Sequence, residues 1–566
     1  MSFDAAKKYL SFPHLEAELR ADLVPLLGAA EAGDAGAAAE LEDRFFEPLA
    51  FGTGGLRGFM AAGLRRMNQP NVRRVTMALA AVAQRHAPDK KIAVVGFDTR
   101  LNSDVFGAET AAVLAAAGYT VYLGDRPLPT PFLCFAMKAL GSGCGAIVTA
   151  SHNPKEYNGY KAYNDLGGQV VEPWDAEIEA HMATLPLVPV PPVAPPGSIL
   201  PIPAEIDAAY VAMGQELLQH PQPFTPARIL YTPFHGTGVA FVPALFERAG
   251  LPVSLSPSQG IQDGSFPTAP RPNPEELAAY ASPLAEADAL GADLVMANDP
   301  DADRIGVVPR RNGSWELMSG NDLAALTLDY LCTQKGRKGA VVSTVVTSDF
   351  MAEVARFHGL PVVWTLTGFK FIAVCMDRLE ALGEPYAFGA EESYGMLIPA
   401  SLRDKDGVTA ALVVGEMAGH YKALGMTLFE AVDALMAKVG TFQNRLVNLE
   451  DARPGGAKRF AEAMGRIRTA GLASLGGEKV VSWEDFQTGQ WFGEGRTETI
   501  LDRPDQRAVA LPIPRANVLK FRLESGAFAA FRPSGTEPKL KVYIQSRTDS
   551  AILDRIEAEA RTLLGL

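Results

Sequence analysis

The run Ile92-Ala93-Val94-Val95-Gly96-Phe97 is short, apolar and rich in β-branched residues. An amphipathic stretch (Asp104–Ala117), a second apolar run (Tyr119–Leu123), another amphipathic stretch (Thr130–Leu140) and a third apolar run (Ala146–Val148) follow it along the chain. Short β-rich runs that alternate with longer amphipathic stretches are typical of strands and helices in an α/β layer. The pattern therefore predicts an α/β fold for this part of the chain.

The alternating pattern occurs in three successive units and then changes. Eight prolines between Pro186 and Pro203 end the first unit, because neither a helix nor a central strand continues where backbone donors are missing. After the third unit, closely spaced strand-like runs precede one final helix, and apolar residues alternate over 540–545 as in a strand with one buried face. We predict α/β domains at 1–205, 206–319 and 320–440, and an α+β domain at 441–566.

Composition sets further bounds. The 566 residues agree with about four domains at roughly 150 residues each. Lys and Arg number 52 against 65 Asp and Glu, and this net charge of −13 argues against nucleic acid or an anionic membrane as a partner.

The four cysteines form no C-x-x-C pair, so we expect buried thiols. No export signal and no membrane-spanning apolar run occurs, so we expect a cytoplasmic protein. The sequence leaves the oligomeric state open.

A polar segment follows the apolar run at 146–148. It reads Thr149-Ala150-Ser151-His152-Asn153-Pro154, and Lys161 follows Ser151 by ten residues. Open α/β sheets bind ligands at the carboxyl ends of their strands, which makes the Ser151 hydroxyl a candidate nucleophile. A serine before Asn-Pro is also typical of a turn or a helix N-cap, so the segment alone leaves both readings open. No G-x-S-x-G elbow surrounds a serine, and an α/β-hydrolase triad is not indicated.

Three carboxylates follow the apolar run at 294–297. Asp299, Asp301 and Asp303 stand at alternate positions before Arg304, and in an extended loop they would converge on one hard cation. Without a cation they would repel one another, unless they form a solvated acidic turn. An EF-hand is excluded because Arg304 and Arg310 stand where that loop needs Gly and Glu. Mg²⁺ completed by phosphate or water fits this donor set best.

Three further polar segments are candidate binding loops. Glu391-Glu392-Ser393 could grip the vicinal hydroxyls of a sugar, or could simply be solvated. The segment 532–536, Arg-Pro-Ser-Gly-Thr, offers the donors that a phosphate dianion needs, although it is also ordinary turn composition. The segment 52–58 is a glycine-rich loop that carries Arg57. Neither G-x-G-x-x-G nor G-x-x-x-x-G-K-[ST] matches it, so nucleotide sites are unsupported.

A hydroxyl, an acidic trio, a candidate sugar loop and a candidate phosphate loop thus occur in order, one in each predicted domain. In these segments the sequence resembles the α-D-phosphohexomutase superfamily, the phosphoglucomutase and phosphomannomutase enzymes. The segment Phe51–Gly58 looks most like the branch of bacterial phosphoglucomutases, phosphopentomutase and glucose-1,6-bisphosphate synthase. The resemblance implies a heart-shaped molecule with three mixed-sheet α/β domains and a C-terminal α+β domain. It also implies Mg²⁺ as cofactor, sugar phosphates as small-molecule partners and glucose 1,6-bisphosphate as activator.

The resemblance further implies roles for particular residues. Ser151 would be carried as phosphoserine and would hold Mg²⁺ together with the three aspartates. Lys161 and Lys405 are the general acid and base candidates. One branch of the family has Gly-His where this chain has Tyr394-Gly395, so that histidine base is absent here and Lys405 becomes the stronger candidate. The residues expected to assist the phosphoryl group are His152, Arg57 and Arg304. Those expected to bind the sugar and its non-reacting phosphate are Thr367, Gly368, Glu391, Ser393, Arg532, Ser534, Gly535 and Thr536.

The leading interpretation is a phosphoglucomutase, an isomerase that interconverts glucose 1-phosphate and glucose 6-phosphate through phosphoserine and glucose 1,6-bisphosphate. Phosphopentomutase, phosphomannomutase and glucose-1,6-bisphosphate synthase are alternatives within the same chemistry. A non-catalytic sugar-phosphate-binding protein is an alternative of another class. A metal-dependent phosphatase is a further one, because loss of the phosphoryl group to water is the failure mode of this chemistry.

Overall fold

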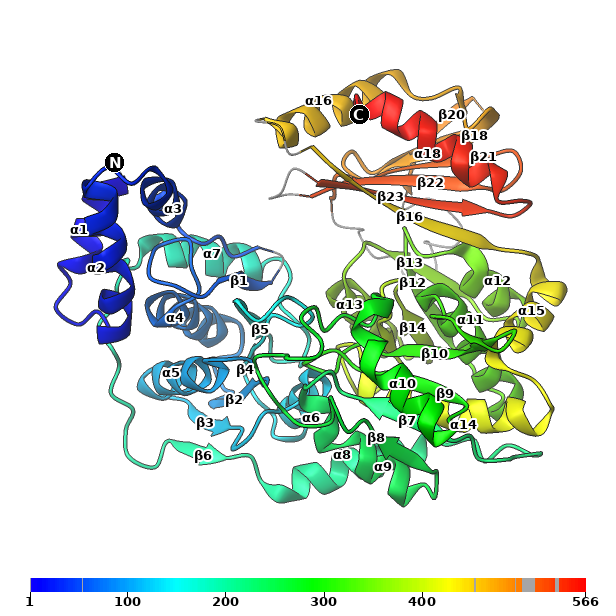
Figure 1. The fold of residues 1–566 in the computed structure, drawn as a ribbon, viewed down its shortest axis with the longest axis horizontal. Coiled ribbons are helices and arrows are strands. Elements are labelled where there is room, and N and C mark those ends of the chain that lie inside the picture. The colour runs from blue at the N-terminus through cyan, green and yellow to red at the C-terminus, as the bar shows by residue number, and fades with distance from the viewer. Residues whose placement is uncertain are drawn as a thin grey trace. The chain divides into compact units, whose positions relative to one another are not determined.

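The structure is a computed structural model that describes residues 2–52, 54–451, 453, 455–493, 495–500, 515–534 and 539–566. Figure 1 follows the chain by colour from its N-terminus to its C-terminus. The chain divides into two compact units. The first unit comprises Met1–Met318 and Tyr394–Gly425, and the second comprises Ser319–Ser393 and Met426–Leu566.

The first unit contains a mixed six-stranded sheet formed by β1 (Gly55–Phe59), β2 (Ile92–Phe97), β3 (Thr120–Leu123), β4 (Cys144–Val148), β5 (Tyr157–Tyr163) and β6 (Ile199–Pro201). The spatial order is β1-β5-β4-β2-β3-β6. Strands β2, β3, β4 and β6 are parallel, and β5 is antiparallel to both β4 and β1. Strands β2 and β4 are apolar because both of their faces are covered.

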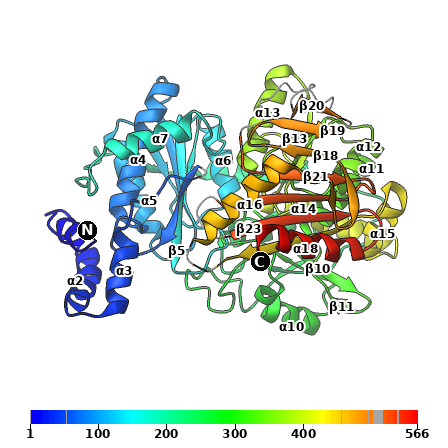
Figure 2. The same ribbon diagram turned by 90° about the horizontal axis from the view of Figure 1, so that it is seen from above.

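Helices cover both faces of this sheet, with α4 and α7 on one side and α6 on the other in Figure 2. The helices α4 (Gln69–His86), α5 (Ser103–Ala116) and α7 (Trp174–Thr184) share one apolar core with the strands. On the opposite face lies α6 (Thr130–Ala139), whose Leu133 and Met137 lie against Gly96 and Gly145. Glycine at these two positions lets α6 approach the sheet closely.

One segment expected as a loop is partly a strand. The glycine-rich segment at 52–58 enters β1, where Arg57 pairs with Gly159 of β5, and Lys161 also lies within β5. Gly55 and Gly159 explain the pairing, because a Cβ on either would collide with neighbouring backbone, so these glycines permit close strand pairing instead of marking a loop.

The N-terminal segment folds into three helices that the sequence pattern did not lead us to expect. They are α1 (Ser2–Leu10), α2 (Ala17–Glu31) and α3 (Ala35–Phe45), and they enclose a small apolar core of their own. Asp34 caps α3 by accepting a hydrogen bond from the Ala37 amide at 2.9 Å. Buried Arg73 of α4 bridges Glu16, which precedes α2, and Glu109 of α5, so ion pairs connect these helices to the layer beside them.

A second mixed sheet completes the first unit, with strands β7 (Ile229–Thr232), β8 (Val253–Leu255), β9 (Leu294–Ala297), β10 (Gly306–Arg311) and β11 (Ser314–Trp315) in the order β11-β10-β9-β7-β8. Strand β7 is parallel to β8 and β9, whereas β10 is antiparallel to β9 and β11. The remaining elements of this unit are α8 (Ala204–Glu216), η1 (Thr237–Ala240), α9 (Val242–Arg248), η2 (Leu277–Tyr280), α10 (Ala281–Leu290), β15 (Met396–Leu397) and α14 (Gly407–Ala423).

The second unit begins with a parallel sheet in which β12 (Ala340–Thr344) lies between β13 (Val362–Thr365) and β14 (Tyr386–Ala390). Its helices are α11 (Gly320–Lys335), α12 (Asp349–Phe357), α13 (Phe369–Leu382) and α15 (Leu428–Val439). Every residue of the three strands is buried, as expected of parallel strands covered on both faces.

The rest of the second unit is an antiparallel sheet built from β16 (Gln443–Glu450), β18 (Glu478–Asp485), β19 (Gln490–Gly493), β20 (Arg496–Thr499), β21 (Leu519–Leu523), β22 (Phe528–Pro533) and β23 (Lys539–Ser546), with β17 (Ser474–Leu475) paired to β18. Helices α16 (Gly456–Ala470) and α18 (Ala551–Leu564) share one core with this sheet and lie on the same face of it in Figure 1. Leu540, Val542 and Ile544 are buried in β23, as predicted. Gln545 is buried too, because it bonds Ser348 and the Asp349 amide.

These sheets confirm the predicted fold class of three α/β layers and a C-terminal α+β layer. The bounds of the four domains given above stay a prediction. All four cysteines are free and buried, as expected. Over the residues that the structure describes, no helix is long and apolar enough to cross a membrane.

Candidate active site

Ser151 lies just beyond the carboxyl end of β4, in the first unit. Its φ of 51° is in the left-handed region, which is uncommon for a residue with a side chain. The side chain is almost fully buried, and its Oγ donates to Asp299 Oδ2 at 2.6 Å and contacts His152 Nδ1 at 3.1 Å. The turn therefore points the hydroxyl at the acidic trio, which is 148 residues further along the chain.

The acidic trio follows β9, and Asp299, Asp301 and Asp303 are all fully buried. One carboxylate oxygen from each lies within 4.8 Å of the others. Oδ1 of Asp301 and Oδ1 of Asp303 have no hydrogen-bond partner among the described residues. Buried oxygens left unpaired in this way are the ligands that a hard divalent cation needs, so the residues fit a metal site. Ala302, between two of them, has a φ of 52° that turns the chain back toward the trio.

Two lysines contact the trio. Lys161 Nζ lies 2.7 Å from Asp301 Oδ2 and 2.9 Å from Asp303 Oδ2, and Lys405 Nζ lies 2.7 Å from Asp303 Oδ2. Burial opposes the charged form of both lysines, but the carboxylates around them outweigh burial, so both pKa values are raised. Burial opposes ionisation of Asp303 too, and the two ammonium groups outweigh it, so its pKa is held well below the ordinary range.

Asp299 differs from its neighbours. Burial and the nearby charges of Asp303 and Asp301 raise the pKa of Asp299 well above its ordinary value. No ammonium group contacts it among the described ion pairs, and its polar neighbours are the Ser151 hydroxyl and the Arg304 amide at 3.1 Å. The carboxyl group whose pKa is raised is therefore the one that contacts the serine oxygen.

Lys405 is held in a loop fixed by buried tyrosines. Tyr163 of β5 donates to Asp404 Oδ2 at 2.9 Å, and Tyr210 of α8 donates to Asp406 Oδ1 at 3.0 Å. Asp406 also caps α14, whose first turn begins directly after the loop. Both carboxylates beside Lys405 are therefore anchored, and the position of the lysine follows from theirs.

The remaining residues predicted for phosphoryl transfer also lie in the first unit. Arg304 donates from Nη1 to Glu275 Oε1 at 2.7 Å. Exposed Arg57 donates from Nη1 to Asn153 Oδ1 at 3.1 Å, next to the serine turn. Burial, together with the positive charges of Arg304 and Arg57, lowers the pKa of His152 well below its ordinary value, so its ring is neutral near pH 7.

The second unit carries the residues predicted for sugar and phosphate binding. Gly368, with a φ of 119°, donates its amide to Glu391 Oε1 at 2.7 Å, and Glu391 is buried just after β14. The Thr367 hydroxyl is buried with no partner among the described residues. Arg532 lies in β22, the Ser534 amide bonds the Lys539 carbonyl, and Ser393 lies two residues after Glu391. Gly535 and Thr536 lie outside the described residues.

The structure thus brings one part of the predicted site together within a single unit. In the first unit these residues are Ser151, His152, Lys161, Asp299, Asp301, Asp303, Arg304, Lys405 and Arg57. The sequence reasoning missed their partners Thr130, Tyr163, Tyr210, Glu275 and Asp404. Thr130 bonds Asp301 through both its amide and its hydroxyl, at 2.9 and 2.7 Å. Its position directly after Pro129, at the start of α6, was the signal that could have drawn attention to it.

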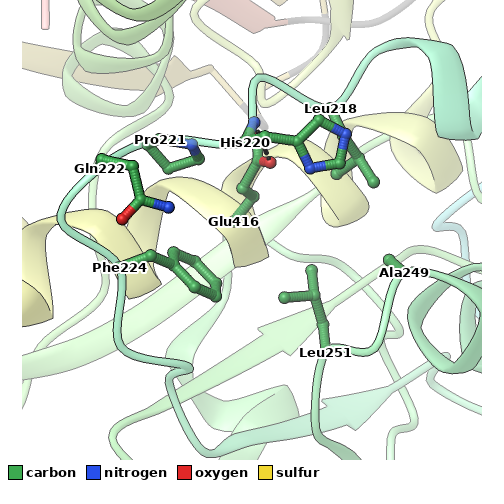
Figure 3. A pocket seen from close by; sticks show the side chains of 8 residues that line it. All are labelled: Leu218, His220, Pro221, Gln222, Phe224, Ala249, Leu251 and Glu416. Atoms are coloured by element: carbon green, nitrogen blue, oxygen red, sulfur yellow. Dashed lines mark hydrogen bonds between the residues drawn. The ribbon is translucent and has the colours of Figure 1, made fainter.

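A cavity of about 120 Å³ lies elsewhere in the first unit and includes none of the predicted site residues. Apolar Leu218, Phe224 and Leu251 line it together with His220 and Glu416, and Figure 3 shows these side chains. The Glu416 carboxylate accepts hydrogen bonds from the amides of Gln219 and His220, each at 2.8 Å.

Comparison with known proteins extends these observations. Four domain families of phosphoglucomutase/phosphomannomutase match the chain: alpha/beta/alpha domain I at residues 48–187, domain II at 208–313, domain III at 319–439 and the C-terminal domain at 494–563. A Haemophilus influenzae protein named "Probable phosphomannomutase" is 33% identical over 501 residues, which cover 87% of this chain and 96% of that protein. A Staphylococcus epidermidis phosphoglucomutase is 32% identical over 514 residues, which cover 88% and 91% of the two chains.

Solved structures share the fold. A phosphoglucomutase/phosphomannomutase family protein from Burkholderia thailandensis aligns with a TM-score of 0.67 at 18% identity, over 91% of this chain and 96% of that one. The open form of a Paramecium phosphoglucomutase, parafusin, aligns with a TM-score of 0.65 at 17% identity, over 92% and 95%. At these identities the alignments establish the fold alone.

Proposed function

Because the chain belongs to the phosphoglucomutase/phosphomannomutase family, and is a mutase of the isomerase class, we propose that it interconverts glucose 1-phosphate and glucose 6-phosphate. The phosphoryl carrier in this proposal is Ser151. The alternative of a non-catalytic binding protein is disfavoured, since a protein that only bound sugar phosphates would need neither a buried serine oxygen nor the acids and bases around it.

One observation carries the proposal. The Ser151 hydroxyl, a buried carboxylate trio and two lysines meet in one place, with Ser151 Oγ 2.6 Å from Asp299 Oδ2. Phosphoryl transfer needs a positioned oxygen, a charge-neutralising group for the phosphoryl oxygens and a means to move one proton. The first unit supplies candidates for all of these.

In the first half-reaction the bond between phosphorus and Ser151 Oγ breaks, and a bond forms between phosphorus and the 6-oxygen of glucose 1-phosphate. That hydroxyl loses its proton to a base, and an acid protonates Ser151 Oγ. The second half-reaction transfers the phosphoryl group from the 1-oxygen of glucose 1,6-bisphosphate back to Ser151, so the sugar leaves as glucose 6-phosphate. Free glucose 1,6-bisphosphate would act as activator because it can phosphorylate Ser151.

Lys161 and Lys405 are the proposed acid and base. Their raised pKa values keep both ammonium groups protonated, which suits the proton donor, and the lysine that acts as base must first give up its proton. Both contact Asp303 Oδ2, whereas the Ser151 hydroxyl contacts Asp299 of the same trio. His152, Arg304 and Arg57 would steady the phosphoryl oxygens, as neutral ring and as cations respectively.

The three aspartates, with Ser151, would hold Mg²⁺, which when bound withdraws charge from the phosphoryl oxygens. Beside Thr367 and Gly368, the Glu391 carboxylate would accept hydrogen bonds from the sugar hydroxyls, and the Ser393 hydroxyl would donate to them. The guanidinium of Arg532 would bind the phosphate that is not reacting, with Ser534 and its neighbours Gly535 and Thr536. Both orientations of the bisphosphate must be accepted, so this binding has to use the hydroxyls of the sugar symmetrically.

Mannose phosphates are the second candidate substrates, because the Haemophilus influenzae relative is named as a phosphomannomutase. The two hexoses differ only in the configuration at C2, so discrimination depends on contacts to one hydroxyl. Comparison of kcat/KM for glucose 1-phosphate and mannose 1-phosphate decides between them, and ribose 1-phosphate is the control for a pentose preference.

A coupled assay tests the proposal. Formation of glucose 6-phosphate from glucose 1-phosphate, with Mg²⁺ and glucose 1,6-bisphosphate present, should fall at least about 1,000-fold in Ser151→Ala, because the phosphoryl acceptor is gone. The matched control is Ser142→Ala, which removes the hydroxyl of another buried serine of the same unit and should leave turnover near wild type. Wild-type turnover in Ser151→Ala would overturn the proposal.

A further inference from the structure

Arg100 is a fully buried arginine that binds the serine turn from the side of β2. Its Nη1 donates to the Pro154 carbonyl at 2.8 Å and to the Tyr157 carbonyl at 3.2 Å. Its Nη2 donates to the Ser151 carbonyl at 2.6 Å and to the Asn153 carbonyl. One planar guanidinium therefore binds four carbonyl groups of a single turn, which a more flexible or smaller cation could not do.

A second series of contacts connects Arg100 to the backbone amide of Ser151. Asp98 Oδ2 lies 3.3 Å from Arg100 Nε and accepts the Thr149 hydroxyl at 2.6 Å. The Thr149 oxygen in turn accepts the Ser151 amide at 2.8 Å. The amide and the carbonyl of Ser151 are therefore both held by one connected pair of buried charges, Asp98 and Arg100.

This connection bears on the strained conformation of Ser151. A residue with a side chain is strained in the left-handed region, and this conformation persists where its surroundings over-determine it. The face of the Phe266 ring lies 4.9 Å from the Arg100 guanidinium, and Arg100 has no exposed side-chain surface. Water therefore has no access with which to replace the four hydrogen bonds if the guanidinium is lost.

We propose that Arg100, held by Asp98, is a positioning residue that fixes the backbone of Ser151 so that its Oγ stays directed at Asp299. The proposal rests on the proposed function, in which Ser151 carries the phosphoryl group. Arg100 does not touch the reacting atoms, since all its contacts to the turn are to carbonyl oxygens. Its effect is on the geometry of transfer and not on the affinity for sugar phosphate.

The first test is the split between kcat and KM in Arg100→Lys. Lysine keeps a charge for Asp98 but cannot span four carbonyls, so kcat should fall about 100-fold while KM changes less than about threefold. The matched control is Arg74→Lys, since Arg74 is a buried arginine of α4 that donates to the Met182 carbonyl and touches no residue of the turn. Its kcat should stay within about twofold of wild type.

The second test measures the turn itself. Amide hydrogen exchange of the segment 149–158 should become faster in Arg100→Lys, while segments of the second unit stay unchanged, and this readout does not depend on turnover. Thr149→Val is the second variant, because it removes the hydroxyl between Asp98 and the Ser151 amide and keeps the shape of the side chain. It should lower kcat and speed exchange in the same direction, and it decides the test if Arg100→Lys fails to fold.

The outcomes separate the two proposals. Loss of kcat with faster local exchange supports the positioning role. If Ser151→Ala is inactive but the folded Arg100 and Thr149 variants keep wild-type kcat and wild-type exchange, the positioning role is overturned and the proposed function stands. If Ser151→Ala is active, the proposed function fails, and the positioning role of Arg100 in phosphoryl transfer fails with it.

Discussion

At the residue scale, the acidic trio is a cluster of three fully buried carboxyl groups in the first unit. Two lysines contact it, yet the Oδ1 atoms of Asp301 and Asp303 have no hydrogen-bond partner among the described residues. A buried carboxylate oxygen without a partner is costly. A divalent cation is the group that would satisfy both at once.

Asp301→Ala tests this arrangement. Loss of one of three carboxylates should weaken Mg²⁺ binding to the full chain at least about 100-fold, measured by calorimetry. Asp125→Ala is the control, because Asp125 is an exposed aspartate of the same unit and should leave the affinity unchanged. An unchanged affinity in Asp301→Ala would mean that the trio does not hold the metal.

The sequence predicted the candidate nucleophile and metal ligands of the site better than the residues that hold them in place. Alternate spacing placed three aspartates in one turn, and a polar segment after a strand marked Ser151. Thr130 and Asp301 are 171 residues apart, and Tyr163 and Asp404 are 241 apart, so no local pattern connects them. Arg100 was missed because an arginine that binds backbone carbonyls needs no particular sequence around those carbonyls.

At the element scale, Asp406 connects the Lys405 loop to the first turn of α14. It accepts the amides of Val408 and Thr409 and the Tyr210 hydroxyl, all with its Oδ1. We expect Asp406→Ala to lower the free energy of unfolding by about 2–4 kcal/mol, since it removes a cap and leaves a buried hydroxyl unpaired. Asp34→Ala removes the exposed cap of α3 and should cost about 1 kcal/mol. Urea unfolding measures both, and equal losses would contradict the account.

An ion pair between buried Asp349 and partly buried Arg522 connects α12 to the antiparallel sheet in the second unit. Asp349 Oδ2 accepts from Arg522 Nη1 at 2.8 Å. Burial alone would raise the pKa of Asp349, but the charges of Arg522 and Lys520 outweigh it and hold this pKa well below the ordinary range. The stability that the pair contributes is therefore complete above the ordinary carboxyl pKa near 4, and it is lost as the pH falls below that value.

Asp349→Asn should therefore lower the free energy of unfolding by about 3 kcal/mol at neutral pH. The difference between wild type and variant should narrow as the pH falls below about 4, because the wild-type carboxyl then takes up a proton on unfolding. Paired urea titrations at several pH values measure this difference. A difference that stays constant down to low pH would contradict the pairing.

Element type was predictable where the apolar pattern was regular, as in β2, β4 and β23. It was not predictable at β1 and β5, where glycines that allow close strand pairing resemble the glycines of a loop. The helices α1–α3 were missed because the apolar core that they enclose is small, so the helical spacing of apolar residues recurs over only a short stretch of sequence.

At the scale of the whole molecule, the two units carry different parts of the proposed chemistry. The first unit holds the serine, the acidic trio and both lysines, and the second holds the candidate sugar and phosphate loops. Variants of the proposed site residues in the first unit, such as Ser151→Ala, should therefore act on transfer of the phosphoryl group, whereas Arg532→Ala in the second unit should act first on KM. A change in kcat alone in Arg532→Ala would contradict this division.

The most direct measurement follows the phosphoryl group of Ser151 through one turnover. The protein is first loaded with isotopically labelled phosphate from labelled glucose 1,6-bisphosphate, freed of excess ligand and mixed with unlabelled glucose 1-phosphate and Mg²⁺. The account predicts that the label leaves Ser151 and appears in glucose 6-phosphate, and that Ser151→Ala takes up no label. Label that stays on the protein while unlabelled glucose 6-phosphate forms, or that appears only as inorganic phosphate, would contradict it.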